Sequence, residues 1–267
     1  MIFSGERRNF PVLVFAGLTA ASLGGLLLLP PIPQDQSYHQ FADQRTLLGI
    51  PNFWNVVSNL PFLAVGAAGL RRFRQDPATV VFFLGIFLTS LGSSYYHWNP
   101  HDGTLFWDRL PMTLSFAAIL ALVVAERVSA RAGAILLWPA LIIGVFSLLL
   151  WRWTDDLRLY FWVQFFPGLA VILLFGLYPP KYTGTYYWIA AGALYALAKL
   201  LEFTDEAVYS TGNLVSGHTL KHLAAAGGCF AILRYFQVRQ RIAEVSAKGK
   251  AGLVRVGQVF TGDDIGS

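Results

Sequence analysis

The feature that most constrains this chain is a series of hydrophobic runs, each close to 20 residues long. A helix of that length crosses the apolar core of a bilayer. With 55% hydrophobic and only 13% charged residues, the chain lacks the polar surface of a soluble domain. The sequence therefore predicts an all-α fold, a polytopic transmembrane helix bundle. The expected spans lie at about 10–30, 52–70, 78–97, 107–126, 132–151, 159–178, 184–202 and 216–236.

Charged residues between the runs indicate an orientation, because basic loops stay in the cytoplasm. Arginines and lysines precede the first run and follow the second, fourth, sixth and eighth runs. We therefore expect both termini to be cytoplasmic, and the net charge of +5 to reflect topology rather than nucleic-acid binding. The opposite, non-cytoplasmic side carries Asp35, Asp43, Asp102, Asp155, Asp156, Asp205 and Glu206.

The first run follows Arg7 and Arg8, as the apolar part of a signal peptide would. It is long, however, and it ends in Leu-Pro-Pro-Ile-Pro rather than in a small-residue cleavage site. We expect a retained transmembrane helix. The end of the chain is polar and glycine-rich, which predicts a mobile tail.

Histidines gather at the non-cytoplasmic face. His97 ends one predicted span, and His218 and His222 open the last one. Ionisable groups in membrane spans mark functional sites by default. Because His218 and His222 are four residues apart, a helix brings their imidazoles to one side, about 6 Å apart. Two such imidazoles, a third ligand and a water suit tetrahedral zinc.

Other readings of these histidines remain. An i, i+4 pair also occurs as a packing or interfacial pair, or in haem proteins. Haem takes its axial ligands on opposite ring faces, so an adjacent pair on one helix fits zinc better. His101 competes with His97 as the third ligand, but Pro100 and Gly103 indicate that the helix has ended there. We expect His101 to have a loop or supporting role.

Two more polar residues lie at the level of the histidines. Ser93 precedes His97 by four residues, which places both on one helix face. Asp108 begins the next span after a short loop, so it starts beside the end of the previous span. Ser93 also reads as a small packing residue, and Asp108 as a first-turn acid favoured by the helix dipole.

This combination resembles the alkaline ceramidase family, part of a superfamily of seven-helix membrane hydrolases that includes the adiponectin/progestin receptors. The resemblance runs from about residue 50 to 236. The motifs that carry it are Ser93-x-x-x-His97, Asp108 in Asp-Arg-Leu-Pro-Met, His218-x-x-x-His222 and the segment Phe53-Trp-Asn-Val-Val-Ser-Asn59.

The resemblance implies a zinc-dependent amidase that cleaves the N-acyl bond of ceramide, releasing a fatty acid and a sphingoid base. It implies that the ligands are His97, His218 and His222, with Ser93 and Asp108 as the other polar members of the site. Animal members also carry a calcium site before the first core helix. Here residues 41–52 hold one acid, one arginine and an asparagine in place of the final acid, which argues against calcium.

The chain is accordingly expected to divide into three parts. Residues 1–50 would form an extra transmembrane helix and an outer loop, residues 51–240 the seven-helix zinc hydrolase core, and residues 241–267 a mobile cytoplasmic tail. The sequence does not indicate an oligomeric state.

For the mechanism, we expect zinc to polarise the amide carbonyl and activate water. Asp108 would act as general base and then as general acid, and Ser93 would donate to the oxyanion. The substrate would be ceramide or a similar acylated lipid that enters from the bilayer, and an ester is an open possibility. The alternatives are a receptor-like, non-hydrolytic zinc-binding protein of the same superfamily and, third, a transporter or haem protein.

The remaining polar residues of the spans read as structural. The spacing of Lys199 and Glu202 predicts an ion pair within one helix, near Asp205. Hydrogen bonds between helices are expected for Asn55, Ser58 and Asn59.

Overall fold

A computed structural model describes residues 3–245, with side chains from residue 13 onward. The predicted mobile tail lies outside the described residues from position 246. The described elements, in chain order, are α1 (Phe3–Leu28), a 3-10 helix η1 (Gln36–His39), α2 (Phe53–Val57), α3 (Leu60–Arg72), α4 (Pro77–Trp98), α5 (Asp102–Arg127), α6 (Ala130–Thr154), α7 (Arg158–Leu177), α8 (Thr185–Phe203), α9 (Asp205–Ser210) and α10 (Gly217–Val238).

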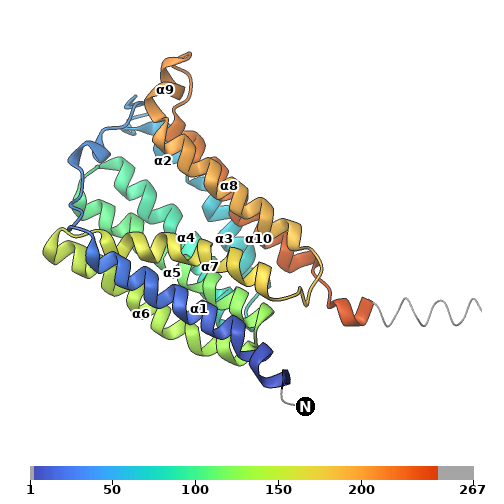
Figure 1. Ribbon diagram of the computed structural model, residues 1–267. Coiled ribbons are helices and arrows are strands. Elements are labelled where there is room, and N and C mark those ends of the chain that lie inside the picture. The colour runs from blue at the N-terminus through green and yellow to red at the C-terminus, as the bar shows by residue number, and fades with distance from the viewer. Residues whose placement is uncertain (1–2, 246–267) are drawn as a thin grey trace, which may run out of the picture.

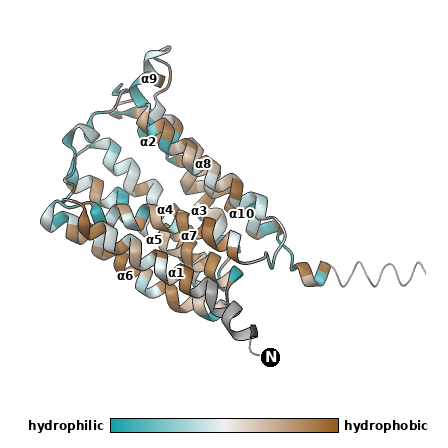
Figure 2. Cartoon of the chain, viewed as in Figure 1, coloured by the Kyte–Doolittle hydropathy of each residue, from teal (hydrophilic) through white to brown (hydrophobic). Residues whose placement is uncertain are grey.

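The long helices form one bundle, which confirms the predicted all-α polytopic architecture (Figure 1). Within residues 3–245, five segments are long and apolar enough to cross a membrane: α2 and α3 together, α4, α5, α6 and α7. Of α1, the stretch Leu13–Leu28 is apolar but shorter. Hydrophobic residues run along the helices, and hydrophilic residues gather at their ends and in the loops (Figure 2).

The outer face of α6 shows why the bundle suits a bilayer. Ile135, Trp138, Ile142 and Phe146 form a stripe at helical spacing and are between 47% and 69% exposed. An exposed apolar stripe of this size is rare on soluble proteins. Such a stripe suits contact with lipid and fits an integral membrane protein.

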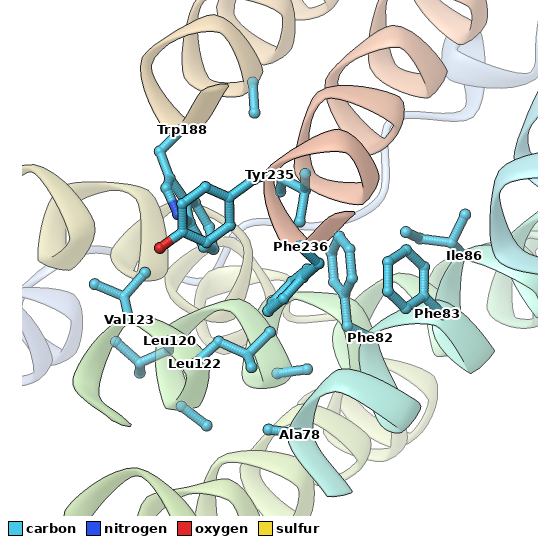
Figure 3. Packing of buried hydrophobic residues seen from close by; sticks show 14 of the residues in the cluster. Ala78, Phe82, Phe83, Ile86, Leu120, Leu122, Val123, Trp188, Tyr235 and Phe236 are labelled. Atoms are coloured by element: carbon cyan, nitrogen blue, oxygen red, sulfur yellow. The ribbon is translucent and has the colours of Figure 1, made fainter. Parts of the chain in front are cut away.

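The hydrophobic core lies toward the end of the bundle where α4 begins and α10 ends (Figure 3). Phe82 and Phe83 of α4 are at most 1% exposed, and they pack near Phe236 of α10. Trp188 of α8 contacts Tyr235 of α10 edge to face. This aromatic packing joins the last two long helices to the rest of the bundle. A second, smaller hydrophobic cluster, which includes Phe41 and Tyr96, lies at the opposite end.

The second predicted span is a helix broken at Ser58 and Asn59, between α2 and α3. Pro61 has no amide proton, so it cannot continue the α-helical hydrogen bonds across this point. Two carbonyl groups at the break also accept side-chain hydrogen bonds from α4: Ser90 donates to Asn59 and Ser94 to Val56. The break therefore anchors α4 next to the start of α3.

The loops divide between two ends of the bundle. The segment between α1 and α2, which contains η1, lies with α9 at one end of the bundle. The start of α1 and the end of α10 lie at the other end (Figure 1). Asp205 ties the first end together, since its carboxylate accepts from the amides of Ala42 and His218. Placing the first end outside the cytoplasm remains a prediction.

Each predicted span contains a helix, although α1 and α5 begin earlier than expected, α1 at Phe3 rather than near residue 10. The fourth span was expected from residue 107, but α5 begins at Asp102 because His101 caps it: the imidazole accepts from the Gly103 amide. The division into an extra helix and a seven-helix core stays a prediction.

Candidate active site

Three histidines meet at the end of the bundle that carries η1 and α9. His97 comes from the last turn of α4, and His218 and His222 from the first turns of α10. All three are buried, and they form a group that could hold a metal ion, with ligand atoms within 4.8 Å of one another. The sequence-based prediction that these three residues converge is therefore confirmed.

The spacing of the nitrogens suits a tetrahedral ion. Nε2 of His97 lies 3.2 Å from Nε2 of His222 and 3.4 Å from Nε2 of His218. Zinc–nitrogen bonds of about 2.0–2.1 Å in a tetrahedron separate two ligand atoms by about 3.3–3.4 Å. Because each neutral imidazole has only one N–H, the cluster can present lone pairs toward one point. The donor set therefore fits a metal that prefers nitrogen ligands.

The break between α2 and α3 orients His222. The Ser58 hydroxyl donates to the Asn55 carbonyl at 3.1 Å and lies 2.7 Å from Nδ1 of His222. With the only hydroxyl proton directed at Asn55, Nδ1 is the donor to Ser58, and Nε2 keeps its lone pair. Metal-binding histidines are typically held in this way by a second hydrogen bond.

The N-terminus of α10 is fixed by its neighbours. Ser216 caps the helix by accepting from the Thr219 amide at 3.1 Å, and the Thr219 hydroxyl donates to Asn55 at 2.8 Å. A Cβ at Gly217 would collide with the Leu201 carbonyl, so the glycine allows α10 to approach α8 closely. These contacts set the position of His218 and His222.

The segment between α1 and α2 covers the histidines. The Phe41 ring contacts the rings of His97 and His218, with centroids 4.7 Å and 4.6 Å away, and it is only 4% exposed. His39 holds the same segment down through Tyr96 at 2.9 Å and Asp102 at 3.0 Å. The cluster is thus shielded by a segment that precedes the first core helix.

Ser93 and Asp108 lie side by side next to the histidines. The Ser93 side chain neighbours the Asp108 carboxylate, and both line a cavity that also reaches His222. Gly92 explains the closeness of α4 and α5, because a Cβ there would collide with the Trp107 carbonyl. The structure places these two residues together as expected from the sequence, while their chemical roles stay predictions.

The cavity has a volume of about 290 Å³. It extends between α7 and α8, where Gln164 donates to the Tyr195 hydroxyl at 3.0 Å. Its walls combine charged residues with an apolar lining that includes Phe62, Met112 and Ala225. A cavity with both kinds of wall suits an amphipathic molecule.

The other sequence expectations have clear outcomes. His101 is exposed, caps α5 and lies outside the group that could hold a metal. Lys199 and Glu202 form the predicted pair, and Glu202 also binds Lys221 at 2.6 Å. Ser58 and Asn55 make the predicted hydrogen bonds between helices, to His222 and Thr219 of α10. Asn59 does not: its side chain donates to the Asn55 carbonyl of its own segment.

Sequence reasoning missed several residues of the site. Phe41, His39 and Tyr38 lie in the segment that was expected only to be an outer loop. Arg109 was noted only as part of a motif, although it is buried and lines the cavity. A signal for Arg109 was present, since an arginine inside a predicted span needs a partner.

A family of known proteins matches the part of the chain that contains several residues of this site. The model of the Ceramidase family matches residues 47–179, which include Ser93, His97 and Asp108 but not the histidines of α10. No curated protein and no solved structure is significantly similar to the chain.

A ceramidase hydrolyses an amide bond, so this match supports a ceramide-hydrolysing activity in general. Ser93 and His97 of α4 and Asp108 of α5 all lie inside the matched range. The chain belongs to the ceramidase family.

Proposed function

We propose that the chain is a zinc-dependent intramembrane amidohydrolase that cleaves the N-acyl bond of ceramide or a similar acylated lipid. The observation that carries the proposal is the spacing of the three Nε2 atoms, 3.2 Å and 3.4 Å from His97, in a buried cluster beside a cavity. In this proposal, His97, His218 and His222 hold the ion.

Bound there, zinc would supply Lewis-acid polarisation of the carbonyl and a lowered pKa for water. The protein residues contribute the proton transfers. Asp108 accepts a proton from the attacking water as the C–O bond forms, and later delivers it to the leaving nitrogen as the C–N bond breaks. The products are a fatty acid and a long-chain amine.

Ser93 is proposed to donate a hydrogen bond to the oxyanion that develops on the carbonyl. It comes from the same α4 face as His97, one turn earlier, and its side chain neighbours Asp108. Loss of one oxyanion donor typically lowers the rate about 10²- to 10³-fold. Phe41 keeps bulk water away from the histidines, which strengthens these polar interactions.

The lipid is proposed to reach the site from the bilayer. The cavity is lined by α7 and α8 residues, including Phe161 and Ala198, and it lies among helices with exposed apolar faces. An acyl chain would lie along Phe62 and Met112. The site is proposed to face the non-cytoplasmic side, as the loop charges predict.

Metal analysis and activity measurements on the purified protein test this proposal. We expect about one zinc per chain, and no bound zinc or activity in His97→Ala or His222→Ala. Asp108→Asn should keep zinc and lose turnover of ceramide. His101→Ala is the matched control, because its imidazole caps α5 outside the cluster. Full ceramide hydrolysis by a metal-free protein would contradict the proposal.

A further inference from the structure

Arg109 is a buried cation of the cavity that lacks hydrogen-bond acceptors among the side chains and backbone that the structure describes. It is 5% exposed, and its Nη1 atom is buried with no hydrogen-bond partner among the described residues. No carboxylate within residues 13–245, where side chains are described, forms an ion pair with it. Guanidinium stays charged in proteins, so this burial is costly unless something binds to it.

Three aromatic rings hold the guanidinium in place. Its Cζ atom lies 4.7 Å from the ring centroid of Trp151, 4.8 Å from Tyr160 and 5.5 Å from Tyr38. Ring faces stabilise the charge but accept none of the directional hydrogen bonds of the guanidinium fork. The cage therefore fixes the orientation of Arg109 and leaves hydrogen-bond donors for another group.

A second buried arginine shows the contrast. Arg127 is 7% exposed and packs on Phe175, but its guanidinium also donates to the Tyr178 carbonyl at 3.1 Å and to Thr185 at 3.3 Å. Arg127 lies away from the cavity and has protein partners. Arg109 lines the cavity, so its missing partner can be a ligand there.

The two lysines of the cavity, unlike Arg109, have a carboxylate partner. Lys199 and Lys221 both pair with the single carboxylate of Glu202. The carboxylates of Asp35 and Asp108 also line the cavity, but neither forms an ion pair with Arg109, so the hydrogen-bond donors of its guanidinium stay available. Hydroxyl, phosphate or carboxylate oxygens of a ligand would complete these hydrogen bonds.

The position of Arg109 indicates which part of a lipid it meets. Its ring partner Tyr38 belongs to η1, and the cavity wall on this side also includes Gln34 and Leu157 from the loops. The apolar wall with Phe62 and Ala225 comes from within the helices. A lipid would place its head group near Arg109 and its acyl chain along the apolar wall.

We propose that Arg109 binds a head-group oxygen on the amine side of the substrate, and so selects N-acyl lipids whose amine part carries hydroxyl or phosphate groups. This inference rests on the proposed function for its substrate, but it concerns recognition rather than bond cleavage. Arg109 is a specificity-determining residue in this proposal. Proton transfer by Asp108 and metal binding by the histidines are unchanged.

The test compares ceramide with an amide of the same acyl chain on a plain alkylamine, which has no hydroxyl groups. Equilibrium binding and turnover of both lipids are measured on the purified full-length protein. We expect the native protein to bind ceramide about 10- to 100-fold more tightly than the alkylamine amide. Arg109→Gln should bring this ratio close to one and leave binding of the alkylamine amide nearly unchanged.

Two variants separate recognition from folding. Arg109→Lys keeps a cation over the three rings but loses the planar fork, and it should retain part of the preference. Arg127→Gln removes a buried arginine outside the cavity and should leave the ratio unchanged. If Arg109→Gln does not fold, the preference of the native protein and its reduction in Arg109→Lys decide the matter.

Several results would overturn the proposal. One is equal affinity of the native protein for the two lipids. Another is an equal loss of affinity for both lipids in Arg109→Gln, which would show that the residue has a structural role. Free fatty acid is tested as well: if Arg109→Gln weakens its binding while the ceramide preference persists, Arg109 binds the product carboxylate instead. Lipid preference without turnover would contradict the proposed hydrolase and leave this inference standing.

Discussion

The Ser58 hydroxyl oxygen lies 2.7 Å from Nδ1 of His222, across the contact between the broken second span and α10. This contact reaches the proposed metal ligand from the side opposite Nε2. It makes a residue outside the ligand set responsible for the tautomer of the imidazole, since Ser58 directs its own proton to the Asn55 carbonyl.

We therefore expect Ser58→Ala to weaken zinc binding about 10- to 100-fold, because the imidazole loses its orienting partner. The measurement is competition for zinc with a chelator of known affinity. Ser147→Ala is the control: that hydroxyl is also buried but donates to the Gly144 carbonyl of its own helix. Equal zinc affinities for the native protein and Ser58→Ala would show that the contact does not matter.

Gly92 sets the distance between α4 and α5 at the level of Ser93 and Asp108. Gly92→Ala should push the two helices apart, lower stability by about 1–3 kcal/mol and reduce ceramide turnover more than zinc content. Thermal unfolding in detergent measures the stability, metal analysis the zinc content, and the rate of ceramide hydrolysis the turnover.

The matched control is Gly176→Ala in α7, where an added Cβ meets nothing within 4 Å. That variant should keep full activity and native stability. A Gly92→Ala protein with native turnover would mean that the close approach of the helices is not needed for the site.

Phe41, which lies in the segment before α2, covers the rings of His97 and His218. Phe41→Ala should cost about 3–5 kcal/mol of stability, as is typical for a buried aromatic side chain. It should also speed zinc release, because water reaches the imidazoles more easily. Metal dissociation is followed with a chromogenic chelator. Phe165→Ala, which removes a half-exposed ring on α7, should release zinc at the native rate.

Asp156 and Arg158 join the end of α1 to the start of α7. The carboxylate accepts from Arg158 at 2.7 Å, and this hydrogen bond holds the pKa of Asp156 below its usual value. Arg158 in turn donates to the Leu29 carbonyl after α1. A depressed folded-state pKa contributes stability above the unfolded-state pKa, and the contribution is lost as the pH falls through the folded-state value.

Asp156→Asn should therefore destabilise the protein at neutral pH by about 1.5–3 kcal/mol. The difference from the native protein should shrink as the pH falls below about 4, where the carboxyl of the unfolded chain protonates, toward the lower folded-state pKa. Unfolding measured between pH 3 and pH 7 tests this, with Glu206→Gln on the exposed α9 as control. A difference that stays constant over this pH range would contradict the role of ionised Asp156.

The sequence predicted much of the fold because bilayer-length apolar runs leave few alternatives. It also predicted that His97 would meet His218 and His222, since loop charges placed their spans at one face. The break at Ser58 was not predicted, although Pro61 carries the signal. A hydropathy average over the whole span does not show that Pro61 lacks an amide proton.

Other parts of the site depend on contacts that no local pattern contains. Phe41 reaches the histidines because Asp205 and His39 hold its segment in place, and those partners lie up to 163 residues apart. The arrangement of Arg109 among three rings likewise combines η1, α6 and α7. Residues that far apart become neighbours only through the packed bundle.

The histidine cluster joins α4 to α10, the last long helix that the structure describes. During synthesis, His97 is therefore made and inserted long before its two partners, which arrive 121 and 125 residues later. A metal ion captured there would fasten the end of the chain to its first half. Zinc supply at the time of assembly, and not only during turnover, would then set how much complete protein accumulates in the membrane.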